Sequence, residues 1–446
     1  MTRICRSIAT ILPACVIGHS ALVDPLINLD VAHGVEVGGV ILGAESKSTT
    51  HTKFVMIALL LASLAMAMRA RPVVPYRLKL LLIPGAMLLA LACVSAIWAK
   101  APADTLTMAV YQSMLVGTLL ISVAVSNDPR RIMQYMLLMF ALVVAANLAA
   151  VLMRPPAHNG HAGIYGYKNT LGGAAGCAFL FGLFHLFQGR LGWRSIAWFT
   201  TFGAAFVTLA SDSKTSIALI FAAPLLAGLI YVASRSLAQG PIATGVLMVG
   251  LSVSGFYTMG LMTGFDVDDV LLATYGDTTF TGRTDIWGLM YDHIQLSPWL
   301  GNGYRGFWSL GVASPKHASE IAFIRTIGSG HNGYLDIMLD LGIVGLCLLV
   351  LYMVLSFQTI GRFGLRPTLR SLSYLAIFIF LLGRNMMESV ILWSTYFDSL
   401  SFLLVSFLAC YDEPLRIPVK SDSEFDRRWT PDSIESGHRI RRSRTV

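Results

Sequence analysis

The stretch from residue 331 to residue 346, HNGYLDIMLDLGIVGL, places a histidine and an asparagine directly before an apolar segment. Asn332 is suited to cap a helix that begins near Gly333, which would point the free amides and positive dipole end of that helix toward His331. Such a helix end binds anions and disfavours a second positive charge, so we expect a neutral imidazole that can act as a base. The alternative is a histidine that only caps or packs at a membrane interface.

Two acidic residues follow on the same predicted helix. Asp336 and Asp340 are four residues apart and therefore share one face, near the start of the helix. We expect them to pair with arginines of a neighbouring loop, or to orient the histidine, rather than to act as nucleophiles.

Cationic side chains gather on the side of the predicted membrane domain where His331 lies. Each of them taken alone is typical of a solvated or snorkelling side chain. Several together offer the charge and hydrogen-bond donors that a diphosphate requires. They are Lys168, Lys214, Arg283, Arg305, Lys316, Arg325 and Arg384.

A short acidic cluster is the one sequence feature that suggests a metal. Asp266, Asp268 and Asp269 form the motif DVDD, which could bind a divalent cation. Hard cations need more oxygen ligands than this motif guarantees, and short acidic clusters are common helix caps. We therefore expect no metal and no other cofactor.

The composition predicts an all-α polytopic membrane protein. The chain has 446 residues, 55% of them hydrophobic and 13% charged, with a mean hydropathy of +0.65. A crossing needs about 20 apolar helical residues, and about twelve such segments recur. One weak span lies within residues 8–23, which we interpret as an uncleaved first helix. The others are 54–68, 80–98, 106–125, 132–153, 170–188, 194–210, 214–232, 242–262, 334–357, 371–383 and 391–410.

Basic residues set the predicted orientation. One set of alternate loops is rich in arginine and lysine, so these loops are expected in the cytoplasm, together with the tail 411–446, which we expect to be disordered. The net charge of +8 then reflects topology and contact with anionic lipid, not nucleic-acid binding. The six cysteines lie in or beside membrane segments and indicate neither disulfides nor a zinc site.

The long loop between two spans faces outward in this topology. The predicted organisation is an N-terminal segment (1–53), a membrane bundle (54–262), a periplasmic loop (263–333), C-terminal membrane helices (334–410) and the tail. Within the loop, the spacing of apolar residues over 285–296 predicts a short helix on the membrane surface. The tryptophans and tyrosines of the loop are typical interface anchors, and stacking on sugar is the alternative.

Several motifs together resemble the O-antigen ligase and polysaccharide polymerase superfamily. The superfamily has the signature H-[NSQ]-x(9)-G-x-x-[GTY]. This sequence matches it with His331, Asn332, Gly342 and Gly345 at the required spacing. GRTDIW and SPWLGNGYRGFW, which begin at residues 282 and 297, resemble its large periplasmic loop. GYKNTLGG from residue 166 and RNMMESVILW from residue 384 resemble segments of exopolysaccharide polymerases of the ExoQ type. The similarity covers roughly residues 50 to 410.

This resemblance implies a glycosyltransferase of the bacterial inner membrane, with its active site on the periplasmic face. The donor and the acceptor would be oligosaccharides linked to undecaprenyl diphosphate. The resemblance implies that His331 is the base and that Arg283 holds the diphosphate. Lys214 stands where many relatives have an arginine, which loses a bidentate contact. Further candidates for the phosphates are Arg305, Arg325, Lys168 and Arg384, with Asn332, Asp336 and Glu388 as supporting residues.

The expected reaction needs no metal and inverts the anomeric carbon. His331 takes the proton of an acceptor hydroxyl while the cations stabilise the departing diphosphate. The Lys-Asn and Glu-Ser segments favour a polymerase over a ligase that transfers polymer to a lipid A core. A transporter is the alternative of another class, but the spans carry few charges in their middles. A chain-length regulator and a flippase of the same pathway are candidate partners.

Overall fold

The computed structural model describes thirteen stretches of the chain. They are residues 2–27, 36–37, 40–41, 50–156, 160–188, 191–264, 268–270, 272, 282–308, 310, 314–361, 369–392 and 397–412. Within these stretches the regular secondary structure is helical, apart from one antiparallel pair of two-residue strands, β1 (Glu36–Val37) and β2 (Val40–Ile41). The predicted all-α fold class is confirmed.

Nine helical segments of the described chain are long and apolar enough to cross a membrane, which makes this a multi-pass membrane protein. They are α1 (Thr2–Gly18) continued by η1 (His19–Val23) and α2 (Asp24–Ile27), α4 (Thr50–Ala70), α5 (Tyr76–Val94) with η2 (Ser95–Ile97), α6 (Pro102–Ser126), α7 (Pro129–Met153), α8 (Lys168–Gln188), α10 (Lys214–Ser236), α11 (Pro241–Thr263) and α14 (Gly333–Ile360).

Three more helices coincide with predicted spans. They are α9 (Leu191–Ala210), α15 (Leu369–Met387) and α16 (Phe397–Tyr411). Every segment predicted to span the membrane thus overlaps a helix. These three do not meet the same length and hydropathy criteria, and α16 has only 15 residues. Twelve crossings therefore stay a prediction.

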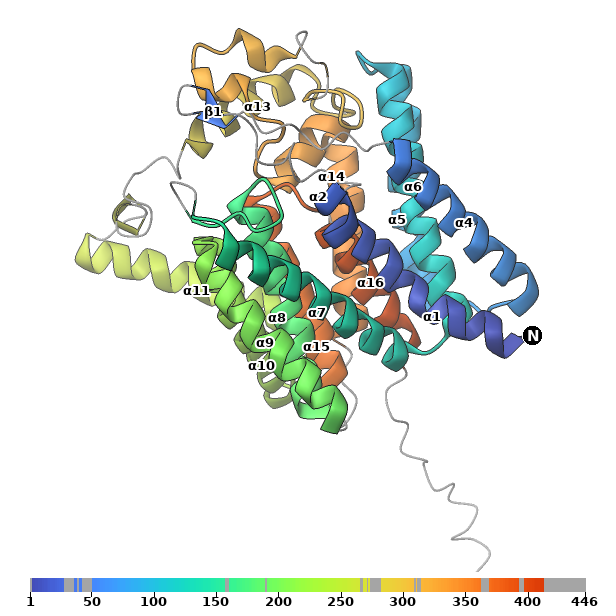
Figure 1. Cartoon of the computed structure of the whole chain (residues 1–446). Coiled ribbons are helices and arrows are strands. Elements are labelled where there is room, and N and C mark those ends of the chain that lie inside the picture. Colours follow the sequence, from blue (N-terminus) through green and yellow to red (C-terminus); the bar gives the residue numbers. More distant parts are fainter. Residues whose placement is uncertain are drawn as a thin grey trace, which may run out of the picture.

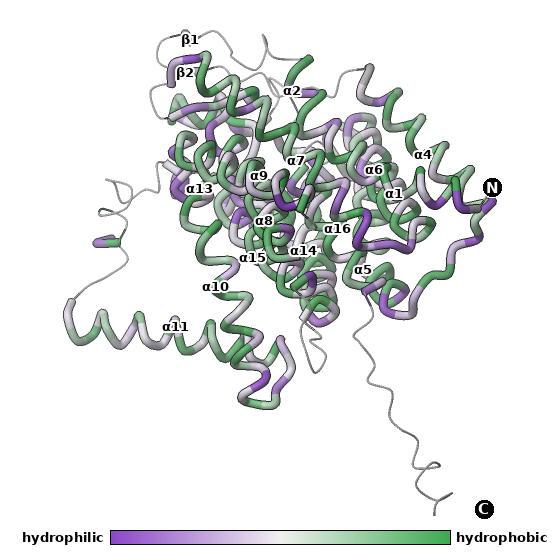
Figure 2. The backbone as a smooth tube through the Cα atoms, turned by 60° about the horizontal axis from the view of Figure 1, so that its bottom comes forward, coloured by the Kyte–Doolittle hydropathy of each residue, from purple (hydrophilic) through white to green (hydrophobic). Residues whose placement is uncertain are grey.

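Burial separates a central helix from a peripheral one. All residues of α16 from Phe397 to Cys410 are buried, and a helix that is apolar on all sides belongs in such an interior position. By contrast, Pro241 and Thr244 are the only buried residues of α11. This helix extends away from the bundle in Figure 1 and is coloured mostly apolar in Figure 2, as expected for a helix that faces lipid.

The segment before α14 has its own small core. In α13 (Arg283–Leu296), Ile286, Met290 and Ile294 recur every four residues and are buried. They pack with Phe307 and Trp308 and with residues of α14, so α13 lies over one end of the bundle (Figure 1). The 3₁₀ turns η4 (Pro315–Ala318) and η5 (Ala322–Arg325) complete the segment. The short helix predicted over 285–296 corresponds to α13.

A glycine interrupts α14, and a neighbouring loop supplies hydrogen bonds at the interruption. Gly342 has φ 64° and ψ −167°, a conformation essentially restricted to glycine. A Cβ atom at this position would lie 2.2 Å from the Trp299 carbonyl, so the two backbones touch. The amide of Ile343 donates to the Pro298 carbonyl (2.9 Å), and the amide of Gly303 donates to the Asp340 carbonyl (2.9 Å). Loop residues thus replace the helical hydrogen bonds that the break removes.

Candidate active site

His331 lies directly outside the amino end of α14. The Asn332 side chain accepts hydrogen bonds from the amides of Tyr334 (3.1 Å) and Leu335 (3.2 Å), so the predicted helix cap is present. His331 has φ 49°, a left-handed conformation that is uncommon for a residue with a side chain. The imidazole is 17% exposed, which leaves it within reach of a molecule at the surface.

Glu388 joins the histidine to an arginine from another element. Its Oε2 atom lies 3.1 Å from Nδ1 of His331, and its Oε1 atom lies 2.8 Å from a guanidinium nitrogen of Arg283. The Asn169 side-chain amide also donates to Oε1 (2.7 Å). The carboxylate therefore connects the start of α14, the start of α13, the first turn of α8 and the end of α15.

The electrostatics of the group favour an ionised Glu388. Burial opposes its ionisation, but the charge and hydrogen bond of His331, followed by the charges of Arg283 and Arg384, lower the pKa of Glu388 below the ordinary glutamate value. A carboxylate that accepts from Nδ1–H leaves Nε2 as the nitrogen able to take a proton. The same carboxylate stabilises the imidazolium that forms when a proton is taken.

Asp336 holds the turn that carries the histidine. Its carboxylate accepts from the Trp308 indole (2.7 Å), from the Gly330 amide (3.2 Å) and from the Ser389 hydroxyl. These bonds connect the residues on either side of the site, because Gly330 precedes His331 and Ser389 follows Glu388. Asp336 thus contacts the residue before the histidine, and its predicted role in orienting His331 stays a prediction.

Tyr167 lies beside the imidazole on the side of α8. Its ring is near-parallel to that of His331, with 6.2 Å between centroids and 27° between planes. About half of the Tyr167 side chain is exposed. The site thus combines an imidazole with an accessible aromatic ring.

The Arg384 side chain is buried beneath the surface. Its side chain is 2% exposed and forms an ion pair of 3.0 Å with Asp398 of α16. It also donates to the Asn169 carbonyl (3.0 Å) and to the Ser216 hydroxyl (2.9 Å). The guanidinium therefore connects α8, α10 and α16 beneath the site, although the sequence suggested direct contact with phosphate.

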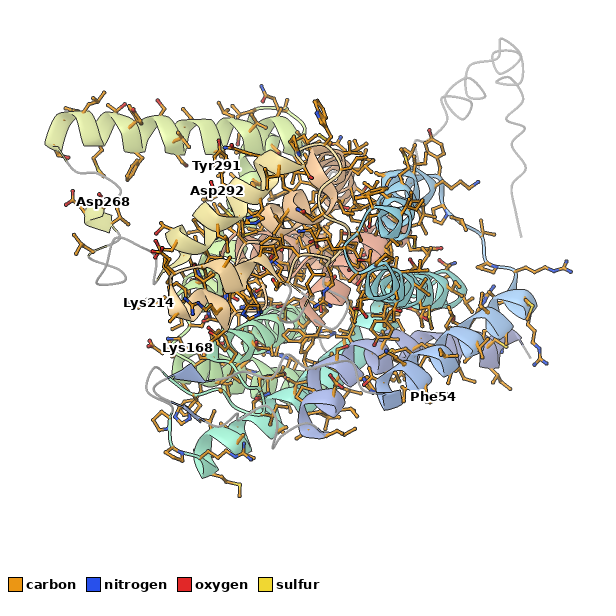
Figure 3. All side chains as sticks on the ribbon, turned by 90° about the horizontal axis from the view of Figure 1, so that it is seen from above. Phe54, Lys168, Lys214, Asp268, Tyr291 and Asp292 are labelled. Atoms are coloured by element: carbon orange, nitrogen blue, oxygen red, sulfur yellow. The ribbon has the colours of Figure 1, made fainter. Side chains whose placement is uncertain are left out.

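The two lysines lie together at one edge of the site. Lys168 begins α8, and its ammonium group lies 3.8 Å from the carboxylate of Asp212. Lys214 begins α10, two residues after Asp212, and its side chain is exposed (Figure 3). Lys168 is the neighbour of Asn169, which contacts Glu388, whereas the first turn of α10 contacts Arg384 through Ser216.

The remaining predicted cations lie in different surroundings. The amide of Arg305 donates to the Asp340 carboxylate (2.7 Å), and its guanidinium lies 3.9 Å from the Met108 sulfur of α6. Asp340 therefore does contact a loop arginine, but through that arginine's backbone. Arg325 is exposed and donates to the Ser319 carbonyl (2.8 Å) within its own segment.

No group of three His, Cys, Asp or Glu side chains able to hold a metal ion occurs among the described residues. Asp268 and Asp269 are described, whereas Asp266 lies outside the described residues.

Some members of the group have no strong sequence signal. Trp308 and Ser389 reach Asp336 from 28 and 53 residues away, and Tyr167 and Asn169 approach from α8. The motifs GYKNTLGG, SPWLGNGYRGFW and RNMMESVILW, which contain these residues, were the only hints. Their resemblance to known segments marked them without indicating that they meet.

Comparisons with known proteins agree with the geometry. Residues 199–350 match the profile of a family described as O-antigen ligase. The chain is also 28% identical, over 275 residues, to the exopolysaccharide production protein ExoQ of Rhizobium meliloti (strain 1021). That match covers 60% of this chain and 62% of the relative, so the chain spans about three fifths of the relative's length. The resemblance indicated by the motifs is thereby confirmed.

Proposed function

We propose that this multi-pass membrane protein, similar to O-antigen ligases and to ExoQ, polymerises oligosaccharide units linked to undecaprenyl diphosphate. The reaction takes place on the periplasmic face of the bacterial inner membrane. One contact group carries the proposal, namely the carboxylate of Glu388 between His331 and Arg283. In it, the proposed base and the proposed phosphate-binding cation contact different oxygens of one carboxylate.

The proposed step is a single displacement. Nε2 of His331 takes the proton of an acceptor sugar hydroxyl, and the hydroxyl oxygen forms a bond to the anomeric carbon of the donor. The bond between that carbon and the diphosphate oxygen breaks, so the anomeric configuration inverts. The diphosphate leaves with the electron pair, and no metal or nucleotide is needed.

Charge stabilisation follows from the neighbours of the base. Arg283 presents a planar guanidinium suited to phosphate oxygens, and the capped end of α14 adds its positive dipole. Lys168 and Lys214 extend the positive charge along the same edge, where they can hold the second phosphate. We assign Arg384 to positioning, because its buried ion pair orders the Asn169 segment that contacts Glu388.

A ligase that transfers polymer to a lipid A core is the second candidate, favoured by the description of the family that residues 199–350 match. It shares the chemistry and differs in the acceptor. A lipid-linked sugar transporter is a third, of another class, and the outward position of the ionisable group weighs against it.

Deletion of the gene and analysis of the glycans distinguishes the three. A polymerase is expected to leave single lipid-linked repeats, whereas loss of a ligase leaves long lipid-linked chains. Substrate trapped on the cytoplasmic leaflet indicates a transporter and contradicts both enzymes. Complementation with His331→Ala or Arg283→Ala should restore protein in the membrane without long polymer, and full polymer with either variant would remove that residue from the mechanism.

A further inference from the structure

One side of the site is an aromatic ring that the proposed mechanism does not use. Tyr167 directly precedes α8, and its ring is near-parallel to the His331 imidazole, with 6.2 Å between centroids and 27° between planes. The residue is 53% exposed, whereas Trp308, which also reaches the group, is 4% exposed. Part of the Tyr167 ring is therefore available to a molecule that reaches His331.

The segment that carries Tyr167 is fixed to the helical bundle. The Ile164 amide donates to the Asn147 side chain of α7 (3.1 Å), and the Tyr165 hydroxyl donates to the Ala21 carbonyl of η1 (2.6 Å). Ile164 and Tyr165 are buried, so they hold the backbone two residues before the exposed ring. A ring whose position is fixed in advance loses little conformational entropy when a ligand stacks on it.

The charged residues of the site also act on the Tyr167 hydroxyl. Burial and the charge of Glu388 raise the pKa of this hydroxyl above the ordinary tyrosine value, although the charge of Arg283 opposes the rise. The phenol therefore stays protonated at neutral pH and does not act as a second base. What Tyr167 offers to a substrate beside His331 is the face of its ring.

An aromatic face next to an imidazole suits a sugar. The C–H bonds on one face of a pyranose are weakly positive, and they pack against the negative face of an aromatic ring. Because the planes of Tyr167 and His331 differ by 27°, a pyranose stacked on Tyr167 is also near-parallel to the imidazole. An equatorial hydroxyl lies near the mean plane of the pyranose, and an imidazole nitrogen accepts a proton in the plane of its own ring. The two orientations match.

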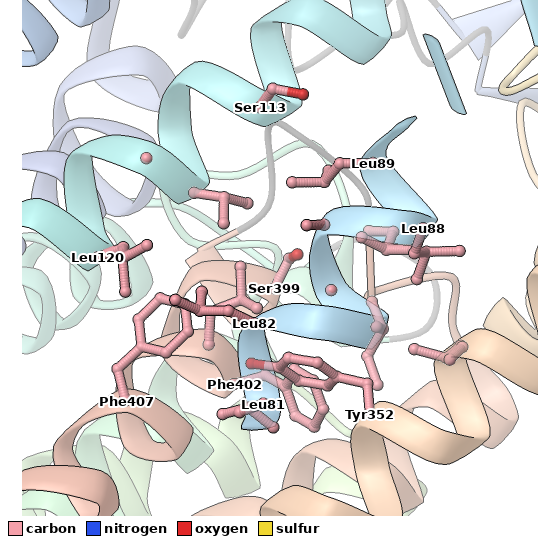
Figure 4. A pocket seen from close by; sticks show the side chains of 18 residues that line it. Leu81, Leu82, Leu88, Leu89, Ser113, Leu120, Tyr352, Ser399, Phe402 and Phe407 are labelled. Carbon is pink, nitrogen blue, oxygen red and sulfur yellow. The ribbon is translucent and has the colours of Figure 1, made fainter. Parts of the chain in front are cut away.

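An apolar cavity elsewhere in the bundle does not offer such a surface. It lies between α5, α6, α14 and α16 and is lined mainly by leucine and other apolar side chains (Figure 4). Its lining contains none of His331, Glu388 and Arg283. A sugar in this cavity would not contact the proposed base, whereas a sugar on Tyr167 would lie next to it.

We propose that Tyr167 is a specificity-determining residue, whose ring stacks on a pyranose of the acceptor and presents an equatorial hydroxyl of that sugar to His331. The inference rests on the proposed function. The ring is assigned to the acceptor because the acceptor hydroxyl is the substrate group that contacts His331, whereas the donor diphosphate contacts Arg283. An axial hydroxyl of the same sugar points out of the plane and is a poor substrate.

Steady-state kinetics test the contact. The substrate is the lipid-linked repeat that accumulates in the deletion strain, and purified full-length protein joins two repeats into a dimer. Tyr167→Leu should raise the apparent KM about tenfold, the size of effect expected when one aromatic contact is lost, and should change kcat by less than about twofold. Tyr167→Gln is a second variant for the same test, and size-exclusion chromatography checks that both are folded.

A labelled acceptor assigns the effect to one substrate. Mild acid releases the oligosaccharide from the lipid-linked repeat, and a fluorescent group is attached to its reducing end. This molecule has no diphosphate, so it acts only as an acceptor. The KM for it should rise about tenfold in Tyr167→Leu, while the KM for the lipid-linked donor stays within about twofold. A rise confined to the donor would overturn the assignment.

Matched variants separate the ring face from the hydroxyl and from general damage. Tyr167→Phe and Tyr167→Trp keep an aromatic face and should keep the KM within about twofold of the natural protein. Tyr291→Leu makes the same change at another exposed tyrosine, on α13, and should leave the KM unchanged. An unchanged KM in Tyr167→Leu, or a Tyr167→Phe variant as impaired as Tyr167→Leu, would overturn the proposal.

The pH dependence of kcat distinguishes sugar binding from mere packing against the base. If Tyr167 only held the imidazole in place, its loss would lower kcat and change how kcat depends on pH. With a stacked acceptor, the pH profile of kcat keeps its shape in Tyr167→Leu, and the loss is overcome by more substrate. A lowered kcat with an altered profile and an unchanged KM would contradict the sugar contact.

The structure of the polymer gives an independent check. NMR of the natural polysaccharide identifies the hydroxyl through which each repeat is joined to the next. An equatorial oxygen is expected at this bond, and an axial oxygen would contradict the orientation assigned to the acceptor.

Failure of this contact and failure of the proposed function give different results. Normal kinetics of Tyr167→Leu in an enzyme that polymerises refute the sugar contact alone. A His331→Ala variant that still polymerises, or a deletion strain with the phenotype of a transporter, refutes the proposed function, whatever Tyr167→Leu does.

Discussion

Nδ1 of His331 lies 3.1 Å from one carboxylate oxygen of Glu388, and the other oxygen lies 2.8 Å from the guanidinium of Arg283. These residues are 57 and 105 positions away from Glu388 in the chain. The carboxylate therefore does more than balance charge. It contacts the His331 ring and the Arg283 guanidinium at the same time, so the position of one depends on the position of the other.

Loss of this carboxylate should impair the reaction without removing the fold. We expect Glu388→Gln to lower the rate of polymer formation by about 10²-fold, because general-base catalysis contributes about that much and the amide cannot stabilise an imidazolium. The rate is measured with purified protein and lipid-linked repeats. Glu320→Gln, at an exposed position between η4 and η5, is the matched control. Equal rates for both variants would contradict the role of Glu388.

The lowered pKa of Glu388 predicts how stability depends on pH. A carboxylate whose pKa is lower in the folded state stabilises that state at pH values above 4.5, the ordinary pKa of the group. This contribution is lost as the pH falls through the lowered pKa. The Tm difference between the natural protein and Glu388→Gln should stay constant at neutral pH and shrink in acid below pH 4.5. A difference that grows with acidification would mean that the pKa is raised instead.

A methyl group at the break in α14 should be costly. Gly342→Ala is expected to destabilise the protein by at least about 1–3 kcal/mol, because the conformation excludes side chains and the Cβ would overlap the Trp299 backbone. Gly250→Ala, on α11 with open space around the Cβ, should leave Tm unchanged or raise it. Tm by intrinsic fluorescence compares the two. Similar values would show that the loop can move away from the helix.

The buried ion pair should behave as a structural element. Removal of one partner leaves an uncompensated charge and costs about 3–5 kcal/mol, so Arg384→Met alone should accumulate poorly in the membrane. The double variant Arg384→Met with Asp398→Leu should recover folded protein, measured by size-exclusion chromatography. Recovery of activity in the double variant agrees with a positioning role. Well-folded double variant without any activity would indicate that Arg384 contacts phosphate directly.

Orientation in the membrane can be tested apart from activity. With the six native cysteines replaced, Arg325→Cys should react with a membrane-impermeant maleimide in cells whose outer membrane is permeabilised. Gln239→Cys, between α10 and α11, should react only after lysis. Labelling in the reverse order would place His331 in the cytoplasm and remove the periplasmic site.

The sequence alone was sufficient to predict where the membrane helices lie along the chain. Each predicted span overlaps a helix because apolar length is a local property, and a bilayer leaves helices as the way to satisfy the backbone. The cap at Asn332 was also predictable, since it joins residues two and three positions apart. Gly342 belongs to the matched signature. The backbone contact that requires a glycine there is with Trp299, in a loop more than 40 residues away.

Only the tertiary structure decided which polar side chains meet. Among the seven cations, the sequence distinguished Arg283 only by a resemblance. In the structure Arg384 is buried against Asp398, Arg283 contacts Glu388, and Arg305 lies beside α6. Hydrophobic periodicity places a residue on a face of a helix but does not say which helix lies opposite. That choice depends on packing between distant segments, where close backbone contacts at glycines and buried ion pairs select one arrangement.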